Sequence, residues 1–152
     1  MRTRHLKLKM LTSRKLVAGC LAAACLVGCG GGDRPVYRAG GQVTFADGTP
    51  VTAGRVNFRP VDDPKPVVAR GEIQPDGTFR LTTFKPGDGA LPGRHLVIVM
   101  PKITFDVERH TEVIAVDIDP RFESYQTSGL EFTVTEKAAE NEFLITVEPP
   151  GG

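Results

Sequence analysis

Few residues beyond the N-terminal region could carry out chemistry. Of the three histidines only His95 and His110 follow residue 29, and all three cysteines lie at or before it. Glu108, His110 and Glu112 come closest to a metal-binding set, because side chains two residues apart on one strand share a face. A solvated turn explains these three residues better. The sequence therefore predicts no metal site, no cofactor and no enzymatic activity.

The remaining candidates are a histidine and two pairs of carboxylates. His95 lies among the apolar residues of an alternating run, where a histidine with one hydrogen bond is more typical than a catalytic base. Asp62 with Asp63, and Asp117 with Asp119, could supply oxygen ligands to Ca²⁺. Neither pair belongs to the full ligand run of a calcium loop. A calcium-stiffened adhesion module is therefore an alternative and not the first interpretation.

The first 28 residues have the composition of an export signal. Residues 1–15 are basic without any acidic residue, and residues 16–28 form an uncharged, mostly apolar run of 13 residues. Such a run spans only about 20 Å as a helix, less than the ~30 Å hydrocarbon core of a bilayer. We therefore interpret residues 1–28 as a cleaved signal peptide and not as a transmembrane helix.

The apolar run ends in Leu26-Val27-Gly28-Cys29, which resembles the lipobox of bacterial lipoproteins. The resemblance implies that signal peptidase II recognises Leu26, Val27 and Gly28 and cuts before Cys29. It also implies that the Cys29 thiol takes a diacylglycerol and that Cys29 becomes the acylated, palmitate-bearing first residue. Since two or more acyl chains hold a protein stably on a bilayer, we expect membrane lipid as a partner. The predicted location is the cell envelope, on the periplasmic or surface-exposed side.

Two further cysteines lie inside the same signal. Cys20 and Cys25 also follow residues that resemble a lipobox. However, Lys15 lies only five residues before Cys20, which leaves almost no apolar run before that cysteine. We interpret both as small apolar residues of the discarded segment. Residues 29–36 then contain the lipidated cysteine and a Gly-rich stretch that ends in Pro35, the composition of a tether.

The charge of the chain disfavours a nucleic-acid partner. All six Lys and Arg residues before Cys29 belong to the signal, so residues 29–152 carry 13 basic against 18 acidic residues, a net charge of −5. Nucleic-acid-binding proteins need clustered Lys and Arg to displace counterions from phosphates. The sequence therefore predicts no nucleic acid, and an unidentified envelope protein is the expected macromolecular partner.

From about residue 36 the sequence alternates apolar and polar residues, with turn residues between the runs. A period of two is typical of half-buried β-strands. Six runs show it: 42–45, 55–59, 67–74, 78–83, 130–135 and 142–148. A seventh run, 93–100, has apolar residues on both faces from Leu96, which predicts a central strand covered on both sides or beside another element. Pro75-Asp76-Gly77 predicts a tight hairpin between the third and fourth runs. About seven short strands predict an all-β chain folded as an antiparallel β-sandwich over residues 37–149.

The stretch 101–119 is a separate question. Two more alternating runs, 103–107 and 114–118, flank a turn at 108–111. We interpret the stretch as a β-hairpin insertion. A long ordered loop packed on the edge of the sandwich is the alternative.

Three stretches of the sequence after the predicted signal peptide resemble those of a known domain family. They are Gly41–Val51 with Gly54–Phe58, Pro75–Phe79 with Thr82–Gly93, and Pro120–Phe122 with Thr127–Leu130. With them, residues 39–148 resemble the carboxypeptidase regulatory-like domain of the transthyretin-like β-sandwich group, which many short bacterial envelope lipoproteins contain. The resemblance implies a non-catalytic structural or protein-interaction module.

The transthyretin-like hydrolases of ureide metabolism share this sandwich and are the enzymatic alternative. They end in Tyr-Arg-Gly-Ser, whereas this chain ends in Glu148-Pro-Pro-Gly-Gly152. A minor hydrolase that uses His95 or His110 is therefore the less favoured interpretation.

Overall fold

The computed structural model describes residues 34–151, and nearly every regular element in them is a β-strand. The predicted signal peptide 1–28, with Cys20 and Cys25, and the predicted lipidation site at Cys29 lie outside the described residues. The strands are β1 (Gly40–Phe45), β2 (Gly54–Pro60), β3 (Ala69–Ile73), β4 (Thr78–Arg80), β5 (Gly93–Met100), β6 (Ile103–Asp106), β7 (Thr111–Ile114), β8 (Leu130–Val134) and β9 (Glu142–Val147). Two short 3-10 turns, η1 (Pro120–Glu123) and η2 (Ala138–Glu140), interrupt them. The all-β prediction is confirmed.

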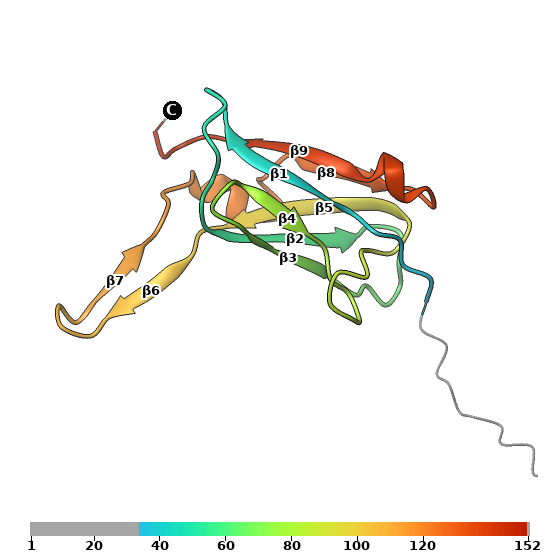
Figure 1. Cartoon of the computed structure of the whole chain (residues 1–152), viewed down its shortest axis with the longest axis horizontal. Helices are drawn as coiled ribbons and strands as arrows, with labels where there is room; N and C mark the ends of the chain where they lie inside the picture. The colour runs from blue at the N-terminus through green and yellow to red at the C-terminus, as the bar shows by residue number, and fades with distance from the viewer. Residues whose placement is uncertain (1–33, 152) are drawn as a thin grey trace, which may run out of the picture. The chain divides into compact units, whose positions relative to one another are not determined.

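Two sheets form the sandwich, as Figure 1 shows. One has three strands in the order β4-β1-β9, and the other has four in the order β3-β2-β5-β8. The alternating runs bury one face each: in β2 the residues at every second position from Gly54 are buried, and β3 repeats this pattern from Ala69. Phe58 is fully buried, with its ring centroid 6.1 Å from that of Phe79 and 5.6 Å from that of Phe143 in the opposite sheet.

The core joins both sheets into one apolar layer. Its buried members are Ala39, Val43, Val51, Val56, Phe58, Ala69, Ile73, Phe79, Leu81, Ala90, Val97, Val99, Ile118, Phe122, Val134, Ile145 and Val147. Strand β5 lies between β2 and β8, and η1 packs against it, which explains why its residues from Leu96 onward are apolar on both faces. Complete burial of large apolar side chains contributes about 1.5–3 kcal/mol each. The sandwich therefore has an independent core.

One strand pair departs from the antiparallel prediction. Strands β1 and β9 run parallel, from Gly40 opposite Glu142 to Phe45 opposite Val147. The cause is nonlocal: β8 belongs to one sheet, and the chain crosses through η2 into the other before β9 begins beside the first strand. Gly41, with φ of 153°, permits the close approach, because a Cβ there would lie 1.9 Å from the carbonyl oxygen of Phe143.

A buried asparagine at the start of β9 fixes this crossing. Asn141 is fully buried. Its Oδ1 accepts the backbone N–H of Thr135 at 2.8 Å, and its Nδ2 donates to the carbonyl oxygens of Thr135 at 2.9 Å and of Arg38 at 3.1 Å. The Asn141 carbonyl accepts the N–H of Gly40 at 2.9 Å. The side chain thus ties the β8–β9 connection to the residues that lead into β1.

The hairpin predicted around Pro75-Asp76-Gly77 forms only at its two ends. Gln74 donates its N–H to Thr78 at 2.8 Å beside the turn, and Arg70 and Thr82 form an isolated antiparallel bridge farther along. Between these points the strands separate, because β3 pairs with β2 and β4 pairs with β1 in the other sheet. The predicted turn is therefore correct, while the predicted continuous pair is wrong.

The stretch after β5 is a hairpin, as predicted, and not a loop on the sandwich edge. Strands β6 and β7 pair only with each other, from Ile103 opposite Ile114 to Asp106 opposite Thr111. Figure 1 shows the pair extending away from both sheets. The second strand lies earlier than predicted: β7 covers Thr111–Ile114, whereas the predicted run is 114–118, so the two share only Ile114. Ile118 instead joins the core, where it is 1% exposed. We call residues 101–115, which contain this hairpin, the arm.

Candidate functional site

The buried histidine has no route to a substrate. The Nδ1 of His95 lies 2.9 Å from the carbonyl oxygen of Gly93, and the side chain is fully buried beside Phe58. Since a carbonyl only accepts, Nδ1 carries the proton, and Nε2 has no partner within the described residues. Burial lowers the pKa of His95, and the hydrogen bond to Gly93 opposes this to a smaller degree. This neutral imidazole has the interior position and single hydrogen bond that were predicted.

The strand face that would join Glu108, His110 and Glu112 does not form. Only Glu112 lies on a strand, whereas Glu108 and His110 lie in the turn of the arm, where His110 has φ of 51°. The chain reverses there because the Asp106 carboxylate accepts the N–H groups of Glu108 and Arg109 at 3.0 and 3.1 Å. Over residues 34–151, no three His, Cys, Asp or Glu side chains are grouped to hold a metal ion.

Three of the four candidate calcium carboxylates, all but Asp117, have other contacts in the described residues. Asp63 forms an ion pair with Arg34, and an Asp62 oxygen lies 3.6 Å from the Arg94 guanidinium. Asp119 caps η1 by accepting the backbone N–H two residues later at 2.9 Å. These carboxylates therefore stabilise loops and do not converge on one point.

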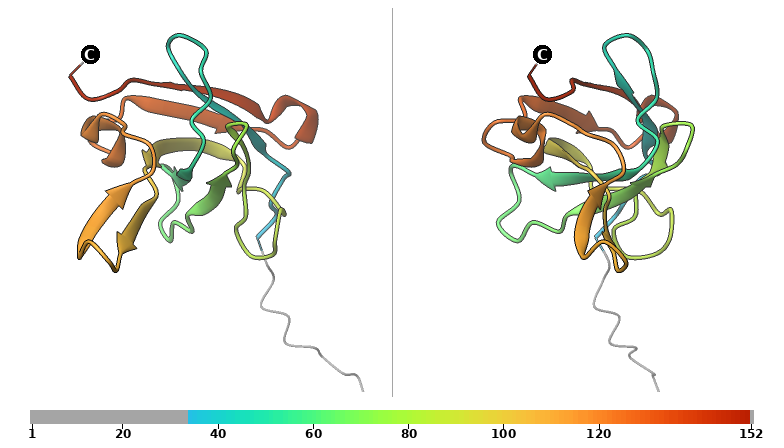
Figure 2. Two further views of the ribbon diagram at one scale, coloured as in Figure 1. Left: turned by 60° about the vertical axis from the view of Figure 1, so that its left-hand side comes forward. Right: turned by 90° about the vertical axis from the view of Figure 1, so that its left-hand side faces the viewer.

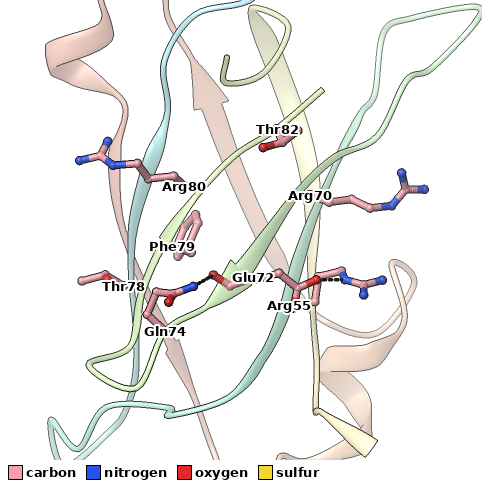
Figure 3. A pocket seen from close by; sticks show the side chains of 8 residues that line it. All are labelled: Arg55, Arg70, Glu72, Gln74, Thr78, Phe79, Arg80 and Thr82. Carbon is pink, nitrogen blue, oxygen red and sulfur yellow. Dashed lines mark hydrogen bonds and ion pairs between the residues drawn. The ribbon is translucent and has the colours of Figure 1, made fainter. Parts of the chain in front are cut away.

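A cleft opens where β3 and β4 separate, and Figure 3 shows the side chains around it. Its lining consists of Arg55, Arg70, Glu72, Gln74, Thr78, Phe79, Arg80 and Thr82. The Glu72 carboxylate accepts Nε of Arg55 at 2.8 Å, which neutralises one of the three arginines. In Figure 3 the guanidinium groups of Arg70 and Arg80 point away from each other on opposite sides. The arrangement therefore lacks the converging donors that an anion site needs.

The arm exposes more apolar surface than any other described element. Ile103 is 54% exposed, Phe105 59%, Val107 73% and Ile114 50%. The register places Ile103 opposite Ile114 and Phe105 opposite Glu112, so these side chains share one face of the hairpin. Thr104, Asp106 and Thr111 occupy the other face together with Val113. The arm is thus an amphipathic two-stranded sheet whose apolar side is open to solvent.

Sequence reasoning found the hairpin but missed this exposure. Alternation predicts a strand with one face prepared for burial, and it does not reveal whether the body supplies the covering surface. A two-stranded hairpin alone in water is marginally stable at best. The apolar face of the arm is therefore the strongest candidate for a contact site on the described body.

The predicted lipidation site lies outside the described residues. Leu26, Val27, Gly28 and Cys29 lie before the first described residue, Arg34. Within the described residues, no helix has the length and apolar character needed to cross a bilayer.

Comparisons with known proteins add little. No protein-family model matches the chain, and no curated protein matches it. Among solved structures, a 9R-lipoxygenase from Cyanothece PCC8801 resembles the fold weakly, with a TM-score of 0.40 and 16% sequence identity. The likeness covers 76% of this chain and 17% of that chain. The candidate site therefore has to be interpreted from its own chemistry.

Proposed function

We propose that this protein is a lipid-anchored envelope protein whose carboxypeptidase regulatory-like β-sandwich serves as a non-catalytic structural or protein-interaction module. The observation that carries the proposal is the order of the N-terminal features: a basic segment, an apolar run and the box Leu26-Val27-Gly28-Cys29. The described body begins at Arg34, five residues after the cysteine. Cleavage before Cys29 would therefore leave the sandwich intact and retain every described residue in the mature protein.

The chemistry of the body supports a binding role. His95 is enclosed in the core and His110 lies in the exposed turn of the arm, so the two histidines belong to separate regions. Strands β3 and β8 end one sheet, and β4 and β9 end the other. Edge strands of this kind can accept a strand from a partner protein. An envelope protein that pairs with such an edge is the proposed macromolecular partner.

Replacing the cysteine tests the anchor. Cys29→Ser should move the protein from the detergent-requiring membrane fraction to the soluble envelope fraction or leave it as an uncleaved precursor, and it should abolish labelling with radioactive palmitate. Cys20→Ser and Cys25→Ser are matched controls in the same segment and should remain labelled and membrane-bound. A Cys29→Ser protein that still carries the label would overturn the proposal.

Activity profiling tests the non-catalytic role. Purified residues 29–152 should show no turnover with panels of esters, amides and ureides. Turnover that disappears in His110→Ala would identify a hydrolase and contradict the proposed module.

A further inference from the structure

Within the described residues, the sandwich supplies no surface that covers the apolar face of the arm. Ile103, Phe105 and Ile114 are each at least half exposed on one side of the hairpin. Val107, at the turn, is 73% exposed. An isolated hairpin of this length is marginally stable in water, so a contact that covers its apolar face would stabilise it.

The position of the arm relative to the start of the body indicates what covers it. Figures 1 and 2 show the molecule turned about the vertical axis, and in every view the turn of the arm lies at the bottom. The blue start of the described chain also lies at the bottom, whereas the β1–β2 connection lies at the top. The arm and the chain start therefore lie on the same side of the body.

The length of chain before Arg34 limits how far that residue can lie from a membrane. Arg34 is the fifth residue after Cys29, and a chain spans at most about 3.5 Å per residue, or roughly 17 Å over these five steps. A lipid on Cys29 therefore keeps Arg34 within this distance of the bilayer surface, and the arm lies toward the same lower side of the body in Figures 1 and 2. This limit holds whatever conformation the connecting residues adopt.

We propose that the arm docks on the bilayer that holds the lipidated Cys29, with Phe105 and Val107 entering the headgroup region. The inference rests on the proposed lipid anchor. Amphipathic helices bind at the boundary between headgroups and acyl chains with a strength that scales with their buried apolar area, and the apolar face of the arm offers a surface of the same kind. While the arm is docked, the sandwich is oriented with the β1–β2 connection away from the membrane.

Charge distinguishes this contact from electrostatic membrane binding. Residues 101–115 contain Lys102 and Arg109 against Asp106, Glu108 and Glu112, a net charge of −1. Polybasic segments bind anionic lipids because each Lys or Arg contributes favourably near the surface. The arm lacks that excess, so its docking should depend little on anionic lipid or on salt concentration.

A tryptophan scan on tethered protein tests the docking separately from lipidation in the cell. Residues 29–152 contain Cys29 as their sole cysteine and no tryptophan, and they retain the whole described core. Coupling this fragment to a maleimide lipid in phosphatidylcholine vesicles supplies the anchor chemically. A Val107→Trp reporter should show a blue-shifted emission, quenched by lipids brominated on the upper acyl chain. Ala46→Trp, in the β1–β2 connection, should show neither effect.

A second substitution separates docking from mere proximity. Phe105→Asp, introduced together with Val107→Trp, should reduce the quenching to the level of the Ala46→Trp control. Phe105 is 59% exposed, so an unchanged thermal melt would verify that the body still folds. Quenching that is absent with Val107→Trp alone, or unaffected by Phe105→Asp, would overturn the proposal.

Two further outcomes would assign the arm to another partner. If the untethered fragment sediments as a dimer and Phe105→Asp makes it a monomer, the apolar face binds a second copy and the membrane proposal is wrong. Quenching that requires phosphatidylglycerol and disappears in high salt would likewise contradict apolar docking. Loss of palmitate labelling at Cys29 in cells, with quenching retained on maleimide lipid, would refute the anchor while leaving the intrinsic affinity of the arm established.

Discussion

Asn141 provides the sharpest test of how this sandwich is closed. We expect Asn141→Ala to remove the side-chain hydrogen bonds to Thr135 and Arg38 that hold the β8–β9 connection against the start of β1. Three of these bonds are between 2.8 and 3.1 Å long, and the asparagine is fully buried. The parallel β1–β9 pair begins next to Asn141, with Gly40 opposite Glu142, so the loss of these hydrogen bonds should weaken the start of that pair.

The expected cost follows from the number of bonds. Each buried hydrogen bond contributes a net of about 0.5–1.5 kcal/mol, so three lost bonds cost on the order of 3 kcal/mol. Thr135 and Arg38 are partly accessible, which lets water satisfy some of the stranded groups and keeps the cost from rising further. For a domain of this size, 3 kcal/mol corresponds to a decrease in Tm of roughly 10–15 °C.

Asn141→Asp should be more harmful than Asn141→Ala at neutral pH. The substitution places a carboxylate oxygen where Nδ2 now donates to two carbonyl oxygens. Repulsion between this carboxylate and the two carbonyl oxygens raises the pKa of the introduced carboxyl in the folded state. The carboxyl is therefore protonated more readily in the folded protein than in the unfolded chain. The stability of this variant should therefore increase as the pH falls from 7 toward 4.

Thermal and urea unfolding of residues 29–152, followed by circular dichroism, measure these effects. Glu140→Ala is the matched control, because the neighbouring exposed pair with Lys137 should contribute less than about 1 kcal/mol. A cost below about 1 kcal/mol for Asn141→Ala would refute this reasoning, given the usual value of a single buried bond. An Asn141→Asp variant as stable as Asn141→Ala at pH 7 would also refute it.

Three further predictions concern particular residues. Stability should decrease as the pH falls below about 6.5, because the lowered pKa of His95 keeps it neutral in the folded state. In thermal melts, the loss of stability due to His95 at low pH should disappear in His95→Leu and remain in His110→Ala. Gly41→Ala should prevent folding, since its Cβ would lie 1.9 Å from a backbone oxygen, whereas Gly48→Ala, which has open space, should cost only about 1–2 kcal/mol in urea titrations. Asp88→Ala should cost about 2 kcal/mol in the same titrations, because three backbone N–H groups of residues 83–85 lose their acceptor.

The strands themselves could be predicted because their signal is local. Alternation in 55–59 marks β2, the continuous apolar run from Leu96 marks β5, and Asp76-Gly77 marks a turn that the structure contains. The choice of partner strand is not local. Nothing near residue 142 indicates that β9 would run parallel to β1, since that choice depends on which sheet has a free edge when the last strand arrives.

The difference between local and nonlocal signals also explains why some important residues could be predicted from the sequence and others could not. The enclosed position of His95 followed from the apolar residues around it, whereas Asn141 is an ordinary turn residue in the sequence. Its importance comes from Arg38, which lies 103 residues earlier. Glu108, His110 and Glu112 do not share a strand face because the turn at residues 107–110 contains the first two of them. The position of that turn depends on single contacts such as the one from Asp106.

The exposure of the arm also sets the strength of its docking. Full burial of a large apolar side chain contributes about 1.5–3 kcal/mol, but Phe105 and Val107 are already partly covered. Together with Ile103 they should contribute on the order of 4 kcal/mol, which corresponds to a Kd near 1 mM. Free fragment should therefore bind vesicles very weakly in co-sedimentation.

Tethering changes this balance without any new contact. A short tether gives an effective concentration in the millimolar range, comparable to the expected Kd. A lipidated protein should thus alternate between a docked and a free orientation with similar populations. A single apolar substitution should shift this equilibrium markedly while leaving the anchor unaffected. This dependence makes Phe105→Asp on tethered protein a more sensitive probe than any measurement of membrane binding by the free fragment.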